Sequence, residues 1–497
     1  MSQSQILSSL PKGWVWTRVG DITEIIRGAS PRPKGDPKYF GGNIPWIMIS
    51  DVSKSEGKFI SKTRDTVTDE GAKRSRYLKT GTLILSNSGT VCVPKVLAVD
   101  GCIHDGFVAF SNLTKNIEPF YLYHYFNHIR QKVINENRQG VTQVNLNTNI
   151  VREIAVPLPP LNEQRRIVGK VEELFSFLDA GVASLRAVLA QLKRYRQAVL
   201  KAAFEGKLTE QWRKNNDHQK SPALLLEEIK KERKQISTLK NNAKKYKEAV
   251  IPESKGFPPL PPNWAYATAD ELSSQITDGE HITPPRQEKG VYLLSARNVL
   301  DGQLALDDVD FISEKEYERI KKRLNPEQDD VLLSCSGSVG RTCPVPDGIK
   351  FSMVRSVALI KPLKKYVSGK FISYALRTTL LQQQVNSKKT QTAQANIFQG
   401  KIRTLVFPIA PLPEQLIVVS VIEQYFSATD QAEKTVRNAL AYSSVIRQSI
   451  LREAFKGNIV PQKQSDEPAE KLLERIKAER SSIKSKNSQL ELSKYVK

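Results

Sequence analysis

Polar loops at matching places in the two halves of the sequence contain residue types that can bind a nucleic acid. Arg and Lys can donate to guanine edges, Asn and Gln can pair with adenine edges, and all of these, with Ser, can hold phosphates. The candidates in the first half are Arg27, Arg32, Lys34, Ser86, Asn87, Ser88, Lys95, Arg138, Gln143 and Asn145. Those in the second half are His281, Arg286, Arg297, Ser336, Ser338, Arg341, Lys388, Lys389, Gln394 and Asn396. A turn or plain solvation explains any single residue more simply, so the candidate site is the set.

No pattern of catalytic residues accompanies these loops. The sequence lacks a GxxxxGK[S/T] phosphate loop, a dinucleotide-type glycine-rich turn after a strand, and the Asn/Asp-Pro-Pro-aromatic tetrapeptide of amino-methyltransferases. Glu253 and Lys255 fit an ExK nuclease pattern, but chance explains a match in a proline-flanked segment. His124 and His128 share one face of a predicted helix without a third ligand, so we expect no metal site. The sequence therefore predicts a non-catalytic chain with no cofactor of its own.

The composition indicates a folded, strongly basic protein. The 497 residues are 39% hydrophobic and carry a formal net charge of +23. Lys and Arg occur throughout both halves, which favours a polyanionic partner, nucleic acid first. The four cysteines form no CxxC pair, so reduced thiols in a cytoplasmic protein are expected. Neither a signal peptide nor an apolar run of membrane length is seen, and no membrane partner is predicted.

The framework that must position the loops occurs twice. The segment 161–208 (LNEQRRIV to FEGKL) aligns with 412–459 (LPEQLIVV to FKGNI), a shift of 251 residues. The segments before them repeat as well: LPKGWVW (10–16) matches LPPNWAY (260–266), and GTLILSNSG (81–89) matches DDVLLSCSG (329–337). The sequence thus predicts the doubling of a half-protein.

Each copy of the repeated segment predicts one long helix with a coiled-coil seam. In the first copy the seam residues are Val171, Phe175, Leu178, Val182, Leu185, Leu189, Leu192 and Val199, with Arg196 in the polar position. The second copy keeps Ile422, Phe426, Val436, Leu440 and Ile450. Thr429, Glu433 and Ser443 interrupt this second seam, which predicts weaker pairing. Two ordinary core helices, each buried in its own half, are the alternative.

A mixed α/β unit precedes each long helix, at residues 10–157 and 260–408. Short apolar runs that end in small polar residues predict strands leading into loops, including one over 44–53. A helix is expected over 120–140 and an extended segment over 143–160. Residues 212–250 predict a basic helix, for which a solvated face and a linker are preferred over a DNA contact. The predicted domain boundaries are 1–160, 161–250, 251–410 and 411–497.

The doubled order and the quoted motifs together resemble one protein family. The units open with a Pro-x-x-Trp strand (PKGWVW, PPNWAY), and the helices carry PLPPLNEQRRIV, PLPEQ and RQAVLKAAFEGKLTEQWR. This pattern is similar to the specificity subunit of type I restriction–modification systems over nearly the whole chain. The resemblance implies an α+β fold. Two α/β target recognition domains, in a pseudo-symmetric repeat, would be joined by two long antiparallel coiled-coil helices.

The resemblance also implies a function and partners. Each recognition domain would bind one half of an asymmetric bipartite site in double-stranded DNA. The helices would set the spacer and dock two modification (methyltransferase) subunits, which use S-adenosylmethionine to methylate adenine N6. Restriction/translocase subunits would add ATP- and Mg2+-dependent cleavage. The helix motifs carried over as partner and spacer surface comprise Glu163, Gln164, Val171, Phe175, Leu178, Val182, Leu185, Leu189, Leu192, Arg196, Gln197, Phe204, Glu414, Gln415, Ile422, Phe426, Leu440, Arg447, Gln448 and Phe455.

Two other functions are compatible with parts of this pattern. One is a nuclease or methyltransferase acting alone, which would need a cofactor or metal motif. The other is a basic coiled-coil scaffold that does not recognise a DNA sequence. Methyl transfer by the purified chain would support the first, and the absence of sequence-specific DNA binding by the assembled complex would support the second.

Overall fold

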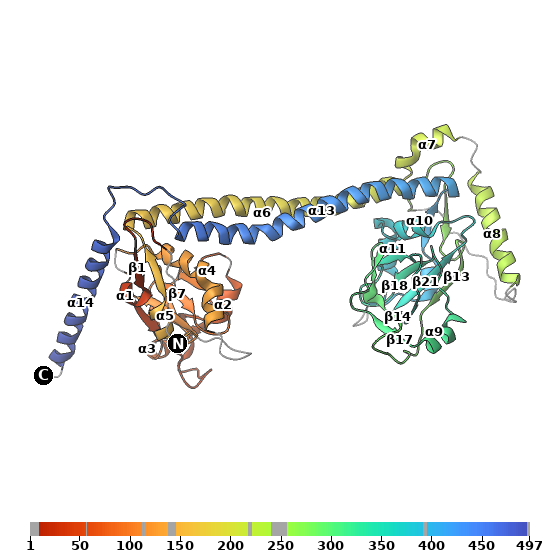
Figure 1. Ribbon diagram of the computed structural model, residues 1–497. Helices are drawn as coiled ribbons and strands as arrows, with labels where there is room; N and C mark the ends of the chain where they lie inside the picture. Colours follow the sequence, from red (N-terminus) through yellow and green to blue (C-terminus); the bar gives the residue numbers. More distant parts are fainter. Residues whose placement is uncertain are drawn as a thin grey trace. The chain divides into compact units, whose positions relative to one another are not determined.

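A computed structural model describes residues 9–55, 57–111, 113, 116–137, 146–216, 221–239, 256–390 and 395–494 of the protein, with side chains as far as Ser481 except those of residues 237 and 239. The chain divides into two compact units. The first unit comprises residues 1–185 and 438–497, and the second comprises residues 186–437. Each unit therefore contains one globular body, one end of the first long helix and the opposite end of the second (Figure 1).

Two small sheets form the globular body of the first unit. One has the strand order β2 (Glu24–Arg27), β10 (Phe107–Ser111), β7 (Leu83–Ser86), β8 (Pro94–Leu97) and β4 (Phe59–Ile60). The other has the order β5 (Asp65–Val67), β3 (Phe40–Ile47), β9 (Gly101–Ile103) and β6 (Arg76–Leu78). The short helices are α1 (Val19–Ile22), α2 (Ile49–Lys54), α3 (Asp69–Lys73) and α5 (Thr148–Glu153).

The longer helix α4 (Pro119–Glu136) of the first unit supplies much of its core. It begins with a proline at its first position, where the missing N–H costs nothing. Tyr121 and Phe126 are fully buried, and Phe126 stacks on Phe110 of β10 with ring centroids 5.0 Å apart. Strand β7 is buried on both faces, which explains why it is a continuous apolar run instead of an alternating one.

The second unit has a related body with different proportions. Its larger sheet has the order β13 (Ser273–Asp278), β21 (Val357–Pro362), β18 (Val331–Ser334) and β19 (Thr342–Pro344). A second sheet contains β17 (Asp310–Ile312), β14 (Val291–Leu294) and β20 (Phe351–Met353), and a ribbon pairs β15 (Val299–Leu300) with β16 (Gln303–Leu304). Its helices include α9 (Glu314–Lys321), α10 (Gly369–Leu376), α11 (Thr379–Lys388) and α12 (Gln399–Arg403).

The opening strand of each body pairs with its closing strand. In the first unit β1 (Val15–Arg18) runs antiparallel to β11 (Ala155–Leu158), and in the second β12 (Ala265–Thr268) runs antiparallel to β22 (Val406–Ile409). The repeated tryptophans, Trp14 and Trp264, are both buried just before the opening strand. The repeated motifs at the two ends of each body are therefore one structural feature, because they form a single ladder next to the long helix.

Two local predictions in the first unit are wrong. The segment 143–160 was expected to be extended, but residues 148–153 form α5, because Asn147 caps it by accepting from Ile150 N at 2.9 Å. The strand expected over 44–53 ends at Ile47, and residues 49–53 instead belong to α2, whose N-cap residue Met48 donates its amide to Asp51 Oδ2 at 2.9 Å. In both places a short polar side chain satisfies a free backbone amide at the start of the helix.

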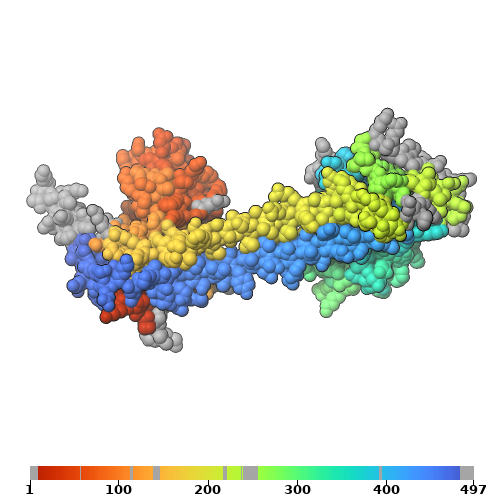
Figure 2. Space-filling model, turned by 90° about the horizontal axis from the view of Figure 1, so that it is seen from above, coloured from red at the N-terminus to blue at the C-terminus, as the bar shows by residue number. Residues whose placement is uncertain are grey.

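The two long helices are confirmed. Helix α6 (Leu161–Phe204) and helix α13 (Leu412–Phe455) have the same length of 44 residues and are related by the shift found in the sequence. Within each unit they lie side by side (Figures 1 and 2). Along residues 176–198 of α6, the positions that are not fully exposed are Leu178, Val182, Leu185, Leu189, Leu192 and Arg196. This pattern is the alternating spacing of three and four that a helical seam requires.

Basic helices that follow the long helices pack on the bodies. Helix α8 (Pro222–Leu239) buries Leu225 and Ile229 in the core of the second unit. Helix α14 (Ala469–Lys494) buries Leu472 and Ile476 in the core of the first unit. The preceding α7 (Glu210–Asn215) belongs to the second unit. The basic segment 212–250 is thus more than a solvated face over its described part, because one stripe of α8 is buried.

Candidate nucleic-acid interface and helical pair

The loop between β2 and β3 of the first unit is exposed but anchored at both ends. Ser75 Oγ donates to Ala29 O at 2.7 Å, and Thr68 N donates to Tyr39 O at 3.0 Å. Three predicted residues have exposed side chains on or beside this loop: Arg27, Arg32 and Lys34. A polyanion could therefore reach them without any rearrangement of the core.

Equivalent serines build the turns that follow β7 and β18. Ser86 and Ser334 are fully buried, and their hydroxyls accept from Val93 N at 3.0 Å and from Arg341 N at 2.9 Å. Each hydroxyl also donates to the carbonyl four residues later. These contacts hold the turn, which gives both serines a structural role and explains why the motif recurs in the two halves.

Lys95 and Asn87 of the first unit are also buried. Lys95 Nζ donates to Ser55 O at 3.0 Å and to Gly57 O at 2.5 Å, and burial lowers the pKa of Lys95. Asn87 is 2% exposed, whereas Ser88 beside it is half-buried. Lys95 therefore fastens the loop after α2 and does not contribute to an exposed basic surface.

Sequence reasoning missed His104, in the turn between β9 and β10. Its neighbour Asp105 accepts from Arg27 Nε through its carbonyl at 3.4 Å, so this turn lies beside the loop of Arg32 and Lys34. Burial is the main cause that lowers the pKa of His104, and Nδ1 accepts from Gly106 N at 2.9 Å. The only sequence signal was an HDG turn between two short strand patterns. The predicted residues Arg138, Gln143, Asn145 and Gln394 lie outside the described residues.

Three basic side chains of the second unit that have no counterpart in the first lie beside carboxylates. His281 Nε2 lies 3.2 Å from Asp278 Oδ2. Arg286 Nε and Arg297 Nη2 lie 3.3 Å and 3.2 Å from the same oxygen, Asp310 Oδ2. The side chains of His281, Arg286 and Arg297 are 66%, 60% and 48% exposed, so the acidic partners orient them without burying them.

The remaining candidates of the second unit lie on neighbouring segments. Ser336 forms an antiparallel bridge with Asn396, which brings the turn after β18 against the segment after α11. Lys388 Nζ donates to Thr404 Oγ1 at 3.1 Å, and Lys389 contacts a side-chain oxygen of its own helix at 2.8 Å. Two further candidates in the turn are exposed: Ser338 and Arg341.

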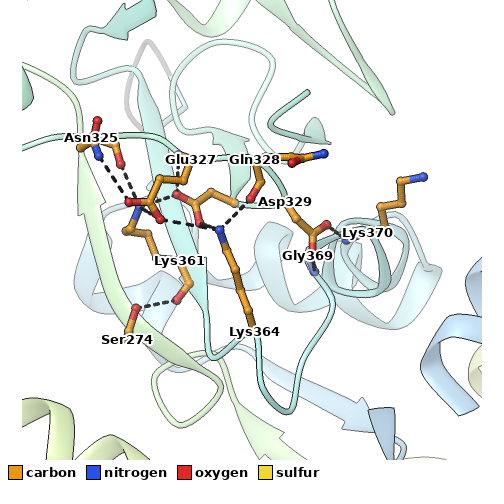
Figure 3. A network of polar contacts seen from close by, with 10 residues as sticks. Ser274, Asn325, Glu327, Gln328, Asp329, Lys361, Lys364, Gly369 and Lys370 are labelled. Carbon is orange, nitrogen blue, oxygen red and sulfur yellow. Dashed lines mark hydrogen bonds and ion pairs between the residues drawn. The ribbon is translucent and has the colours of Figure 1, made fainter. Parts of the chain in front are cut away.

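A charged network fixes the loop 325–330 of the second unit (Figure 3). Asp330 is fully buried, and Lys361 Nζ donates to its Oδ2 at 2.6 Å and to Asn325 O at 2.8 Å. Lys364 Nζ lies 3.5 Å from the other oxygen of Asp330 and donates to Gln328 O at 2.7 Å. Two ammonium groups thus compensate one buried carboxylate, which a buried charge requires.

The same loop is tied to the long helix α13. Asp329 accepts from the amides of Gly369 and Lys370, the first two residues of α10, at 2.8 Å and 2.9 Å. Lys370 Nζ in turn donates to Glu423 of α13 at 2.8 Å. A negative side chain at a helix N-terminus is favourable, so Asp329 fixes both the loop and the helix.

Arginine contacts join the two long helices in the second unit. Arg196 of α6 donates to Glu433 Oε2 at 2.7 Å, to Thr429 Oγ1 at 3.2 Å and to Asp430. Its guanidinium carbon lies 6.0 Å from the ring centroid of Phe426. Thr429 and Glu433 are two of the polar interruptions of the second seam. They face the one arginine in the first seam, and this pairing explains them.

The first unit contains the matching contact with the helices exchanged. Arg447 of α13 donates to Asp179 of α6, and its guanidinium carbon lies 4.2 Å from the ring centroid of Phe175. Arg447, Asp179 and Phe175 are related to the Arg196 contact by the sequence repeat. The pairing of α6 with α13 is therefore antiparallel in each unit, because a residue late in one helix contacts a residue early in the other.

Glutamines at the start of each long helix hold the body beside it. Gln164 donates to Pro159 O at 3.0 Å and accepts from Glu118 N at 3.0 Å, just before α4. Gln415 donates to Ala410 O at 2.8 Å and accepts from Ser368 N at 3.0 Å, just before α10. The repeated glutamine thus joins the start of each long helix to the start of the helix that packs on it, α4 or α10.

The adjacent glutamates differ between the units. Glu414 is fully buried, accepts from Thr209 Oγ1 at 2.6 Å and pairs with Arg213. Glu163 is equally buried, but burial raises its pKa, and Arg166 beside it pairs with Asp466 at 2.6 Å instead. Both units therefore bury a glutamate at this position, but among the described residues an arginine pairs with it only in the second unit.

The described part of the chain offers little other chemistry. It contains no cluster of three or more side chains able to hold a metal ion. The four cysteines are buried and unpaired, and burial raises the pKa of Cys92, Cys335 and Cys343 to about 12. No helix there has the length and apolar composition that crossing a bilayer requires.

Two unlike α/β bodies on a repeated framework of paired helices define a class of protein built for recognition. A family model described as type I restriction modification DNA specificity domain matches residues 11–190 and 277–442. The chain belongs to this family, as the sequence pattern predicted.

Curated relatives agree with this assignment, and a solved structure has a similar fold. The chain is 30% identical over 358 residues to the EcoBI specificity subunit of Escherichia coli, covering 70% of this chain and 69% of that protein. It is 25% identical over 497 residues to the EcoKI specificity subunit of Escherichia coli K12, covering 95% and 96%. A solved chain from work on assembly and conformational transition of a type I restriction–modification system matches with a TM-score of 0.58 at 20% identity. That match covers 90% of this chain and 99% of the other. The predicted α+β fold is confirmed.

Proposed function

We propose that each globular body of this specificity subunit binds one half of an asymmetric, bipartite site in double-stranded DNA. The observation that carries the proposal is a repeated framework bearing two unlike sets of exposed basic side chains. The set of the first unit is Arg27, Arg32 and Lys34, and that of the second is His281, Arg286 and Arg297. A repeated framework favours two equivalent binding modes, whereas unlike side chains favour two different base sequences.

The paired helices set the spacer between the two half-sites and dock two modification subunits. Each helix of 44 residues is about 66 Å long at 1.5 Å per residue. The matched contacts of Arg196 and Arg447 support a stiff pair, because each cross-links the helices within its own unit. A stiff spacer suits half-sites that recur at roughly 34–36 Å or a related distance.

The chain itself carries out no chemistry in this proposal. The modification subunits bind S-adenosylmethionine and methylate adenine N6, and restriction/translocase subunits use ATP and Mg2+. The similarity to curated proteins named as specificity subunits supports this division of labour.

A methylation map tests the proposal. DNA is sequenced from cells that carry this gene beside its modification gene and from cells that lack only this gene. The expected result is a split, asymmetric adenine-methylated motif that disappears with the gene. Replacement of the first globular body alone should then change one half of the motif. Unchanged methylation without this chain would instead favour the alternative, a basic coiled-coil scaffold.

A further inference from the structure

We propose that helix α9 of the second unit is a phosphate-binding ridge that holds the DNA backbone beside the loops of Arg286 and Arg297. This inference rests on the proposed function, because it extends the same DNA surface. It assigns affinity to α9 and leaves sequence discrimination to the loops.

The exposed face of α9 is basic. Lys315, Arg319 and Lys322 recur at steps of four and three, which places them on one face of the helix and its C-terminal cap. They line, with Glu318 and Asn325, a shallow hollow of about 490 Å³. Among the described residues, no ion pair involves Lys315 or Lys322, whereas Arg319 pairs with Glu316 at 3.0 Å. Two ammonium groups on this face thus remain available to an anion.

An exposed arginine just after the C-terminal cap of α9 connects the helix to the proposed DNA surface. Arg323 donates to Glu280 Oε1 at 2.7 Å and to Gly279 O at 3.1 Å, in the segment that carries His281. At the other end, Ser313 caps α9 three residues after Asp310, the carboxylate that orients Arg286 and Arg297. The ridge and the loops therefore form one continuous surface within the second unit.

The surroundings of α9 make the ridge rigid. Its apolar face buries Tyr317 and Ile320, and the following loop is fixed by the contact of Asn325 O with Lys361. The backbone that carries the lysines is thus fixed, and their ammonium groups can contact phosphates as point charges that carry no base preference. A partner that binds this ridge should therefore be a regular polyanion, and a DNA strand beside the loops fits that requirement.

The first unit has a smaller helix in the same place. Helix α3 follows β5 as α9 follows β17, and its cap Thr68 accepts from Gly71 N at 3.1 Å. It has five residues against the eight of α9, and its Lys73 is paired with Glu70 at 2.8 Å. The ridge is thus a feature of the second unit, and we expect the two halves of the site to depend unequally on salt.

Salt-dependent DNA binding by the assembled specificity and modification subunits tests the inference. Fluorescence anisotropy is measured between 50 and 200 mM salt on two duplexes, one carrying the methylated motif and one scrambled. The double variant Lys315→Gln/Lys322→Gln should flatten the slope of log affinity against log salt by roughly 2, since each phosphate contact contributes about 0.9. Affinity for both duplexes should fall by a similar factor, on the order of tenfold at low salt. The methylated motif should stay the same.

The double variant Lys231→Gln/Lys234→Gln is the matched control, because it also removes two exposed lysines of the same unit, on α8. It should leave slope and affinity unchanged. An unchanged slope in the Lys315→Gln/Lys322→Gln variant would overturn the inference, as would a loss confined to the motif duplex, which would mean base contacts. Failed assembly with the modification subunits would show a protein-binding helix instead. If the wild-type complex bound both duplexes equally, the proposed function itself would fail.

Discussion

Replacing Arg196 with Met should loosen the helical pair of the second unit more than the equivalent change, Arg447→Met, loosens that of the first. Methionine keeps the apolar stem and removes the charged head, so the change tests the polar contacts instead of the packing. Arg196 donates hydrogen bonds to Thr429, Asp430 and Glu433. Among the described residues, the guanidinium of Arg447 donates to Asp179 alone.

The expected sizes follow from the exposure of these groups. Arg196 and Glu433 are 23% and 24% exposed, so their charge-assisted contact contributes about 1.5 kcal/mol, the low end for such bonds. The Asp430 carboxylate is 70% exposed and adds little, and Thr429 adds about 0.5 kcal/mol. A total near 2 kcal/mol results for Arg196. Arg447 and Asp179 are 37% and 64% exposed, and with the cation–π contact to Phe175 the sum is about 1 kcal/mol.

Hydrogen exchange measured by mass spectrometry resolves the two sites in one protein. A loss of about 2 kcal/mol should accelerate exchange in peptides covering 186–204 and 425–437 roughly 30-fold, because each 1.4 kcal/mol is tenfold. Arg447→Met should accelerate peptides covering 170–185 and 438–450 about fivefold. Equal effects, or a larger effect of Arg447→Met, would refute the argument that Thr429 and Glu433 are the partners of Arg196.

Three further changes test other parts of the structure. Insertion of four residues near Arg186 should lengthen the spacer in the methylation map by about 6 Å, or one to two base pairs, without altering either half-site. A changed half-site sequence would contradict the role of the helices as a spacer. Arg213→Met should destabilise the second unit by about 3 kcal/mol in thermal unfolding, because it leaves the fully buried Glu414 without its cation. An effect below about 1 kcal/mol would mean that the hydrogen bond from Thr209 is enough to stabilise the buried carboxylate. Burial lowers the pKa of His124 to about 4, whereas the pKa of an unfolded histidine is about 6.5. As the pH falls between these two values, the unfolded chain takes up the proton before the folded chain does. The first unit therefore loses stability over this pH range. His124→Tyr should remove this component in melts at pH 7 and 5, and an unchanged pH dependence would count against it.

The sequence predicted the framework well because the framework depends on periodicity. The seam of α6 follows spacing alone, so Leu178, Val182 and Leu185 could be assigned without any tertiary information. The doubled motifs form the paired opening and closing strands of each body. Local side-chain competition was harder to foresee: the cap at Asn147 turned an apparently extended segment into α5.

The candidate site was predicted less completely, because burial decides which polar residues are available. Lys95 and Ser86 have the right chemistry for binding an anion. Both are buried, however, and their polar atoms form hydrogen bonds with the backbone of the first unit. Conversely, the sequence candidates did not include Lys315 and Lys322. Helix α9, which carries Lys315, is linked to the loops of the second unit through Asp310 and through the contact of Arg323 with Glu280, which no spacing in the sequence reveals.

The two units share the packing where each body joins the long helices, but they differ in the groups that pair with the buried charges there. Glu163 and Glu414 occupy equivalent, equally buried places, but Glu414 pairs with Arg213 while the pKa of Glu163 is raised by burial. His124 packs on Phe175 where Tyr374 packs on Phe426, with ring centroids 5.7 Å apart in both cases. Both differences place the titratable, less compensated group in the first unit. Acid acts on these two groups in opposite directions. Protonation of His124, whose pKa is lowered, should loosen the junction between the first body and the helical pair, whereas protonation of Glu163, whose pKa is raised, should favour the folded state there.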